Sequence, residues 1–363
     1  MKKWHILMIG LGSIGQRHVR NLKRLLGDQC EISAYRVRRL QQTFSDTMQI
    51  RDGVNLEAEY QIKVYTDLEE ALGLKQEREK PDLVFITNIT SKHMECALAA
   101  AKAGCNIFLE KPVSDSMAGV ERLMRLQEEK KIHIFMGYQN RYHVCIKKLR
   151  EYLEEGVLGR LVSVDAAFCE RLTTMHTYED YSTTYMARKE MGGGPILNLQ
   201  IHDLDYLQWL FGMPKTVYAA AGKHSGLNID VEDHAVVSYV TDYQTGGDSP
   251  ESNPLTVTSR SDFLQYPPVH TCTVVGEKGR IELDFNRATV TLIPEDGRPK
   301  VSEYPDFARN DMFLQELQDC LRCIEEDTPE EIPLSEGVKG LKIALAAKES
   351  AARKALADIK SIF

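Results

Sequence analysis

Three glycines near the start of the chain, Gly10, Gly12 and Gly15, constrain its fold more than any other feature. They follow a short apolar stretch at 4–9 and precede an amphipathic segment at 14–26. Glycines at this spacing allow a tight turn from a strand into a helix, and they let the backbone approach a pyrophosphate at the positive end of that helix. The alternative is a tight turn that binds no ligand. Because both flanks have the expected character, we predict a dinucleotide site formed by Gly10, Gly12, Ser13, Ile14 and Gly15.

Up to residue 137, short apolar stretches alternate with amphipathic segments, as in a parallel sheet covered by helices. The expected strands are 4–9, 31–36, 62–65, 82–87, 106–109 and 132–136, and the expected helices are 14–26, 67–73, 91–103 and 115–129. Right-handed crossovers between such strands produce a doubly wound sheet. We therefore predict an α/β fold that begins with an NAD(P)-binding Rossmann domain over 1–137.

The pattern changes after Gly137. Helices are expected at 143–155, 199–211, 309–326 and 335–356, and strands at 161–170, 216–222, 234–241, 255–264, 270–275, 280–284 and 288–293. The Thr- and Tyr-rich segment 172–194 is typical of a long loop over a site. We predict a substrate-binding α+β domain over 138–363 with a large, mostly antiparallel, open sheet. An open sheet face exposes apolar area, so we expect a homodimer or homotetramer formed through this sheet.

The composition narrows the class of protein. A chain of 363 residues with net charge −8 lacks the basic surface that nucleic-acid binding needs. We expect no membrane association, because no apolar run is long enough to span a bilayer. The eight cysteines are scattered, mostly in apolar segments, as in a cytoplasmic protein with reduced thiols. Cys320 and Cys323 form a motif-like pair without a second pair or a nearby histidine, which favours a core role over metal or redox use.

The residues about twenty positions after the glycines choose between NAD and NADP. An acidic side chain there binds the ribose diol of NAD, whereas arginine accommodates the 2′-phosphate of NADP. This stretch contains Arg36, Arg38 and Arg39 and no carboxylate. An exposed basic helix start is the alternative, but the charge and the planar groups of the arginines favour NADP over NAD.

A second motif, Glu110-Lys111-Pro112, follows the expected strand at 106–109. The carboxyl end of a parallel strand faces the crevice in which doubly wound folds bind ligands. An ammonium held there can polarise a hydroxyl or a carbonyl group beside a nicotinamide ring. A surface lysine in a loop is the alternative for Lys111, and the motif alone does not exclude it.

A third motif is a glycine run, 192–194, followed by a helical pattern that carries Asn198 and His202. Residues four apart share one face of a helix, and the glycines allow the start of the helix to approach a ligand closely. Histidine is suited to accepting a proton at neutral pH. The alternative for His202 is a core histidine satisfied by Asp205 or by a backbone group.

Together these motifs resemble the Gfo/Idh/MocA oxidoreductases, the family of glucose–fructose oxidoreductase and inositol dehydrogenase. The resemblance extends over nearly the whole chain and includes 87–93, 137–141 and 276–279. The segment 181–190 looks like the branch associated with bacterial sugar and surface-polysaccharide metabolism. The resemblance implies a two-domain enzyme in which Lys111 faces cofactor and substrate and His202 is the general base.

The resemblance also implies further site residues. Those expected at the cofactor are Thr87, Asn88, His93, Glu110, Lys111 and Gln139, and those expected at the substrate are Lys111, Arg141, Tyr185, Arg188, Asn198 and His202. The chain departs from the family pattern in two places. Asn198 stands where many members carry aspartate, so it keeps hydrogen-bonding groups without the charge. Asn88 stands where many members carry proline.

The leading hypothesis is hydride transfer between NAD(P) and a secondary hydroxyl of a sugar, a sugar derivative such as a nucleotide sugar or sugar acid, or a cyclitol. A second hypothesis is redox-assisted elimination, such as glycoside cleavage with tightly bound NAD. A third is a dinucleotide sensor without catalysis, which Asn198 keeps open.

Overall fold

Two β-sheets organise the chain, each within its own compact unit. The first unit comprises Met1–Tyr138 and Arg309–Gly337, and the second comprises Gln139–Ala308 and Val338–Phe363. The computed structural model describes residues 3–37, 42–45, 49–75, 80–243 and 253–362.

The first unit contains a six-stranded parallel sheet with the order β3-β2-β1-β4-β5-β6. The strands are β1 (Trp4–Ile9), β2 (Cys30–Tyr35), β3 (Lys63–Tyr65), β4 (Leu83–Ile86), β5 (Asn106–Glu110) and β6 (Ile134–Gly137). The central strands are apolar on both faces because helices cover both sides of the sheet. This confirms the predicted doubly wound Rossmann sheet.

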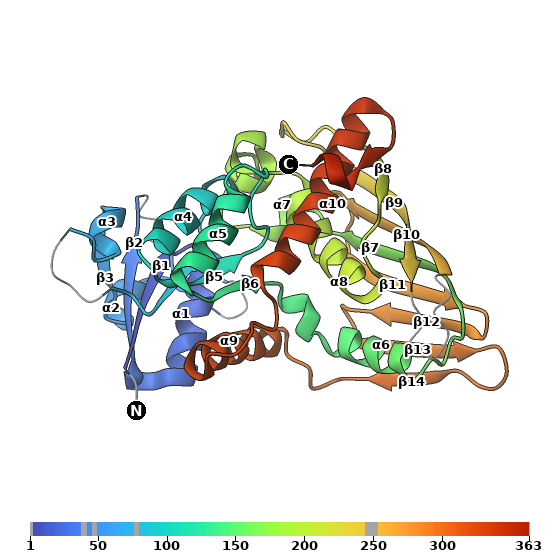
Figure 1. The fold of residues 1–363 in the computed structure, drawn as a ribbon, viewed down its shortest axis with the longest axis horizontal. Coiled ribbons are helices and arrows are strands. Elements are labelled where there is room, and N and C mark those ends of the chain that lie inside the picture. Colours follow the sequence, from blue (N-terminus) through green and yellow to red (C-terminus); the bar gives the residue numbers. More distant parts are fainter. Residues whose placement is uncertain (1–2, 38–41, 46–48, 76–79, 244–252, 363) are drawn as a thin grey trace. The chain divides into compact units, whose positions relative to one another are not determined.

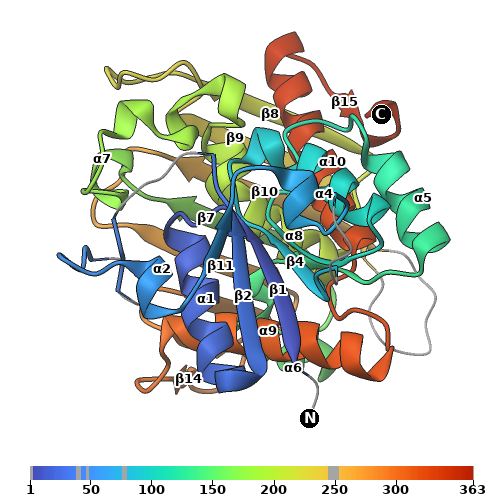
Figure 2. The same cartoon turned by 90° about the vertical axis from the view of Figure 1, so that its left-hand side faces the viewer.

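The helices of this unit are α1 (Ser13–Leu26), α2 (Leu56–Glu59), α3 (Leu68–Ala71), α4 (His93–Lys102), α5 (Val120–Lys130) and α9 (Arg309–Glu326). Helices α1 and α9 pack together on one face of the sheet, and α4 packs with α5 on the other (Figure 2). The strand order reverses between β1 and β4, and ligands of doubly wound folds bind at the carboxyl ends of the strands beside that point.

Helix α9 belongs to the first unit. The domain boundary predicted after residue 137 had placed it in the second domain. Side-chain contacts with α1 explain the difference. Asn310 accepts a hydrogen bond from Arg17 at 3.0 Å, and its amide donates to Asn21 at 2.8 Å. The Arg17 guanidinium lies 4.7 Å from the centre of the Phe313 ring.

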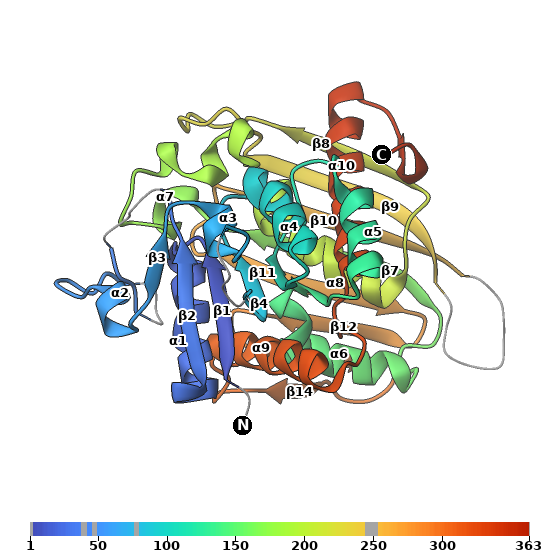
Figure 3. The same ribbon diagram turned by 60° about the vertical axis from the view of Figure 1, so that its left-hand side comes forward.

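The second unit is built on a nine-stranded sheet with the order β14-β13-β12-β11-β7-β10-β9-β8-β15 (Figure 3). Its strands are β7 (Leu161–Cys169), β8 (Thr216–Gly222), β9 (His234–Tyr243), β10 (Asn253–Asp262), β11 (Val269–Gly276), β12 (Gly279–Asp284), β13 (Thr289–Pro294), β14 (Lys300–Glu303) and β15 (Ala357–Asp358). Only the β7–β10 pair among these neighbours is parallel, so the expected mostly antiparallel sheet is confirmed. The short strands β14 and β15 were not predicted.

Helices α6 (Val144–Glu154) and α8 (Ile201–Phe211) pack against this sheet, α8 on β7, β9 and β10 and α6 on β12 and β13. Helix α10 (Leu334–Arg353, labelled in Figure 1) begins in the first unit and ends in the second. In the second unit, Ser350 Oγ accepts a hydrogen bond from the backbone N–H of Ala219 at 2.9 Å. The expected alternation of side chains along the strands is present: Tyr218 and Val240 are about half exposed, whereas their neighbours Val217 and Tyr239 are buried.

The segment predicted to be a loop over 172–194 contains α7 (Leu172–Met175) and short 3₁₀ turns. A hydrophobic cluster holds it in place, with Leu172, Met186 and Ala187 packed against Ile229 and Phe263. Every helix among the described residues is too short or too polar to cross a membrane.

Candidate active site

The turn after β1 has the shape of a dinucleotide cradle. Gly10 has φ +101°, and a Cβ there would lie 2.9 Å from the backbone nitrogen of Asn88. A Cβ on Gly15 would lie 2.4 Å from the carbonyl oxygen of Gly10. A Cβ on Gly12 would meet no atom within 4 Å. Two glycines therefore serve close packing, and the third borders open space at the N-terminus of α1, where Ser13 and Ile14 begin the helix.

The residues after β4 hold this turn and the next loop. Thr87 Oγ1 donates a hydrogen bond to the carbonyl oxygen of Gly10 at 2.8 Å. The His93 ring joins two loops, since Nδ1 lies 2.8 Å from the carbonyl oxygen of Pro112 and Nε2 lies 3.1 Å from that of Asn88. Burial lowers the pKa of His93, so the neutral ring donates to one of these carbonyls at a time. Thr87 and His93 thus shape the backbone around the predicted cofactor site.

Glu110, at the end of β5, lies between α1 and Lys111. Its Oε1 lies 2.8 Å from His18 Nε2, and its Oε2 accepts a hydrogen bond from the backbone N–H of Lys111 at 3.3 Å. The His18 ring is enclosed by Phe85 and Phe108, with ring centres 5.3 and 4.9 Å away. Glu110 is therefore fixed by the core of the sheet, and sequence reasoning had not identified His18 as its partner.

Lys111 occupies the carboxyl end of β5, as predicted. Burial lowers its pKa from the ordinary value of 10.5 to about 8, although the negative charge of Glu110 acts in the opposite direction. A lysine in this state carries a proton at neutral pH and gives it up more readily than a surface lysine does. Its position and its pKa suit a group that donates a hydrogen bond to a reacting oxygen atom.

The arginine cluster after β2 is more complicated than the sequence suggested. The Arg36 guanidinium forms an ion pair with the carboxylate of Glu57, the second residue of α2. Arg38 and Arg39 lie outside the described residues. A carboxylate thus lies beside Arg36 after all, on a residue 21 positions further along the chain.

In the second unit, the glycine turn 192–194 leads into a π-helix, Ile196–Gln200, and then into α8. The Asn198 side-chain amide donates to the carbonyl oxygen of Gly194 at 2.8 Å and lies 3.4 Å from that of Gly192. This contact gives Asn198 a role in closing the turn that the sequence did not predict. The π-helical turn at Ile196–Gln200 was not predicted from the sequence.

His202 is the second residue of α8 and is buried, with 5% of its surface exposed. Its ring lies 6.1 Å from that of Phe168. Phe168 stacks on His270 at 4.0 Å, and His270 lies 3.1 Å from the carboxylate of Asp203. His202 therefore lies beside an aromatic stack that a buried contact between His270 and Asp203 holds in place. The alternative interpretation of His202 was a core histidine bound to Asp205. In the structure, Asp205 binds Arg141.

Arg141, which was predicted to bind the substrate, has a buried partner on α8. Its Nε and Nη2 donate to the two carboxylate oxygens of Asp205 at 2.8 and 2.7 Å, and both side chains are buried. The guanidinium also lies 4.8 Å from the centre of the Trp209 ring. These contacts indicate a structural ion pair that fastens 139–142 to α8.

The other residues predicted to bind cofactor or substrate, and the cysteine pair, have the following surroundings. Gln139 is buried at the start of the turn Gln139–Tyr142. Tyr185 packs against the hydrophobic cluster under 172–194. Arg188 is partly exposed and lies 3.9 Å from Asp230. Cys320 and Cys323 are both buried, and Cys323 Sγ donates to the carbonyl oxygen of Cys320, as core thiols would.

Comparison with known proteins places these features in a family. Residues 4–138 match the model of the oxidoreductase family with an NAD-binding Rossmann fold, and residues 146–282 match that of the GFO/IDH/MocA C-terminal domain. The chain is 28% identical to myo-inositol 2-dehydrogenase of Thermotoga maritima over 365 residues, which cover 98% of each protein.

Two solved structures extend the comparison. A probable dehydrogenase from Thermotoga maritima has a TM-score of 0.73 at 26% identity and covers 99% of this chain and 100% of its own. Levoglucosan dehydrogenase, solved with NADH and levoglucosan, has a TM-score of 0.78 and covers 98% of this chain and 99% of its own; at 16% identity it shows the fold. The consecutive family matches, the Rossmann sheet and the second sheet lead to one conclusion: the chain belongs to the GFO/IDH/MocA family of oxidoreductases, whose N-terminal domain binds NAD.

Proposed function

We propose that the protein is an NAD(P)-dependent dehydrogenase or reductase that acts on a secondary hydroxyl of a sugar, a sugar derivative or a cyclitol. The observation that carries this proposal is Lys111, a half-buried ammonium group with a pKa of about 8 at the carboxyl end of a Rossmann strand. The similarity to myo-inositol 2-dehydrogenase supports a polyol as the substrate.

The chemistry assigned to the chain needs one base and one hydrogen-bond donor. When bound, the nicotinamide accepts or supplies the hydride. His202 takes the hydroxyl proton in the oxidation direction, since a neutral imidazole is the side chain best matched to that task near neutral pH. Lys111 donates a hydrogen bond to the same oxygen and stabilises the negative charge that develops on it.

The cradle at Gly12 and the N-terminus of α1 hold the pyrophosphate, and the end of β2 holds the adenosine ribose. The positive charge of Arg36 is the feature on which a preference for NADP over NAD rests, and the pairing of Arg36 with Glu57 weakens that preference. Arg188 and Tyr185 are proposed to contact the substrate. Asn198 is also proposed to contact the substrate. Its side-chain hydrogen bond to Gly194 keeps the turn 192–194 closed.

A screen of inositols, sugars, sugar acids and nucleotide sugars with NAD and NADP tests the proposal through the change in nicotinamide absorbance. Turnover of at least one polyol by the purified protein is the expected result. Tight dinucleotide binding with no hydride transfer to any of these compounds would contradict it. Conversion of a glycoside without net cofactor reduction would point instead to redox-assisted elimination.

Three variants test the two catalytic assignments together. Lys111→Ala and His202→Asn should each lower kcat about a hundredfold or more, with dinucleotide affinity retained. The double variant should be about as slow as the slower single variant, because groups that serve one step are strongly non-additive. If the loss of kcat in the double variant equals the product of the two single losses, the two residues do not act in the same step.

We further propose that the protein assembles as a homodimer or homotetramer through the sheet of the second unit, and that it works in the cytoplasm. Exposed apolar side chains on that sheet, Val162, Tyr218, Val240 and Val301, support the first proposal. The eight buried free thiols support the second. Light scattering coupled to gel filtration measures the assembly, and a monomer at micromolar concentration would contradict it.

A further inference from the structure

The end of β2 presents two side chains of opposite charge. Arg36 follows the strand directly, and its backbone N–H donates to the carbonyl oxygen of Tyr65 at 3.0 Å. Its guanidinium is bound by the Glu57 carboxylate. The Arg36 side chain is 7% exposed and that of Glu57 is 28% exposed. A ligand that reaches this end of the strand therefore meets the carboxylate more readily than the guanidinium.

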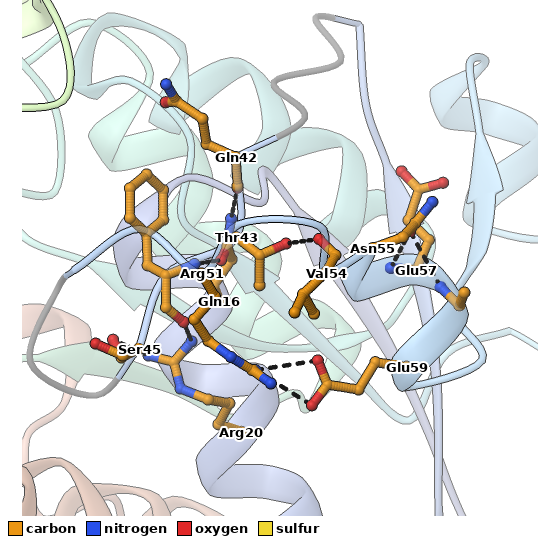
Figure 4. A network of polar contacts seen from close by, with 12 residues as sticks. Gln16, Arg20, Gln42, Thr43, Ser45, Arg51, Val54, Asn55, Glu57 and Glu59 are labelled. Atoms are coloured by element: carbon orange, nitrogen blue, oxygen red, sulfur yellow. Dashed lines mark hydrogen bonds and ion pairs between the residues drawn. The ribbon is translucent and has the colours of Figure 1, made fainter.

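Polar contacts at both ends hold helix α2, which carries that carboxylate, in place. Asn55 caps the helix by accepting hydrogen bonds from the backbone N–H groups of Glu57 and Ala58 at 2.9 and 3.2 Å. The Arg51 guanidinium binds the carboxylate of Glu59 at 3.1 and 3.2 Å. Figure 4 shows these contacts as part of one polar network.

The same network fastens the segment before α2 to α1 and to the glycine turn. The Gln16 amide donates to the carbonyl oxygens of Leu11 at 3.1 Å and of Gln42 at 2.8 Å, and its oxygen accepts from the backbone N–H of Phe44 at 2.8 Å. Arg20 donates to the carbonyl oxygens of Phe44 and Ser45 at 2.7 and 3.0 Å (Figure 4). The position of Glu57 is thus tied to the element that holds the pyrophosphate in this fold.

The two charges make opposite demands on a cofactor. A carboxylate accepts hydrogen bonds from the ribose 2′- and 3′-hydroxyl groups of NAD, and it repels a 2′-phosphate. An arginine binds that phosphate, but here it must first be released from its carboxylate partner.

We propose that Glu57 is a specificity-determining residue that reads the adenosine ribose and, by occupying Arg36, limits the preference for NADP. This inference deepens the proposed function and rests on it. It assigns to α2 the role that Rossmann folds usually give to an acidic residue at the end of β2.

The test is a comparison of dissociation constants for NAD and NADP, measured by calorimetry on the full-length protein and on Glu57→Gln. The glutamine keeps a hydrogen bond to Arg36 and removes the charge. NAD should bind more weakly and NADP more tightly, so the ratio of the two constants should move toward NADP by about tenfold. Thermal unfolding of both proteins checks that the variant is folded.

Glu59→Gln is the matched control, because it removes one carboxylate from the same helix while Arg36 keeps its partner. Its ratio should stay unchanged. An equal shift in Glu59→Gln would attribute the effect to net charge and overturn the proposal, as would equal weakening of both cofactors in Glu57→Gln.

A second measurement uses 2′-deoxy-NAD, which lacks the hydroxyl that Glu57 is proposed to bind. The wild-type protein should lose about tenfold in affinity relative to NAD, and Glu57→Gln should lose clearly less. Should Glu57→Gln fail to fold, Glu57→Asp, which withdraws the carboxylate by one methylene group, replaces it in the same comparison. Equal losses in both proteins would overturn the proposal. A wild-type protein that binds neither NAD nor NADP would refute the proposed function itself, which is a different result.

Discussion

His18 Nε2 lies 2.8 Å from Glu110 Oε1, and both side chains are buried. This contact connects the second turn of α1 to the residue that precedes Lys111. The contact fixes the position of the Glu110 carboxylate, and the negative charge of this carboxylate raises the pKa of Lys111 against the effect of burial.

Glu110→Gln should consequently move the pH dependence of the reaction. The ammonium form of Lys111 is the active form, so kcat/KM should fall as the pH rises through about 8 in the wild-type protein. Without the charge of Glu110 the pKa of Lys111 falls further, and the alkaline limb should move down by about one pH unit. Pre-steady-state or steady-state rates across pH 6 to 10 measure this. Glu95→Gln, which changes an exposed carboxylate paired with Lys92, should leave the limb in place.

Lys111→Met should make the folded protein more stable at neutral pH while removing turnover. Because the folded-state pKa is lowered from 10.5 to about 8, the cost of burying the cation is fully present below pH 8 and disappears as the pH rises toward 10.5. We expect a gain of about 1–2 kcal/mol at pH 7, less than the full shift implies because the side chain is only half-buried. Urea unfolding at pH 7 and at pH 10.5 measures the difference, which should shrink at the higher pH. A Lys111→Met variant that is less stable than the wild-type protein at pH 7 would contradict the view that burying the Lys111 ammonium group costs free energy.

Alanine substitutions at two glycines of the same turn should have opposite consequences. Gly12→Ala places a methyl group where no protein atom lies within 4 Å, so folding should be almost unaffected and dinucleotide affinity should fall about tenfold or more. Gly15→Ala places it 2.4 Å from the Gly10 carbonyl oxygen, so stability should fall by about 2 kcal/mol or more. Melting temperatures and titrations with NAD separate the two effects. Normal NAD affinity in Gly12→Ala would show that the cofactor does not occupy this turn.

Substitutions of the Arg141–Asp205 pair should affect stability and spare substrate binding. Arg141→Met leaves a buried carboxylate without its bidentate partner and should cost about 3–5 kcal/mol. Arg141→Met combined with Asp205→Leu should cost less than Arg141→Met alone, because no buried charge is then left uncompensated. Arg141→Lys keeps the charge but loses the bidentate geometry, so it should be less stable with an unchanged KM. A raised KM with unchanged stability would restore Arg141 as a substrate ligand.

Several predicted site residues have partners in the structure that the sequence did not indicate. The sequence showed that Arg36 lies at the end of β2, but Glu57 meets it from 21 residues away. Arg141 was expected at the substrate, and it binds Asp205 from 64 residues away. Asn198 was expected in an α-helix, and it lies in a π-helix in which its side chain binds the carbonyl oxygen of Gly194. Hydropathy periodicity is a local property, so it cannot report pairings between distant segments or one extra residue in a helical turn.

Local sequence patterns were enough to predict the six parallel strands, the glycine turn and the lysine at the end of β5. Each of these features depends on residues that are neighbours in the sequence, whose periodicity reflects the local backbone geometry. Helix α9 has an ordinary amphipathic pattern, and its contacts with α1, which include hydrogen bonds with Arg17 and Asn21, were not visible in the sequence. The pKa of Lys111 likewise depends on how deeply the folded chain buries it. Burial and the meeting of opposite charges arise from packing between remote segments, and no short stretch of sequence contains that information.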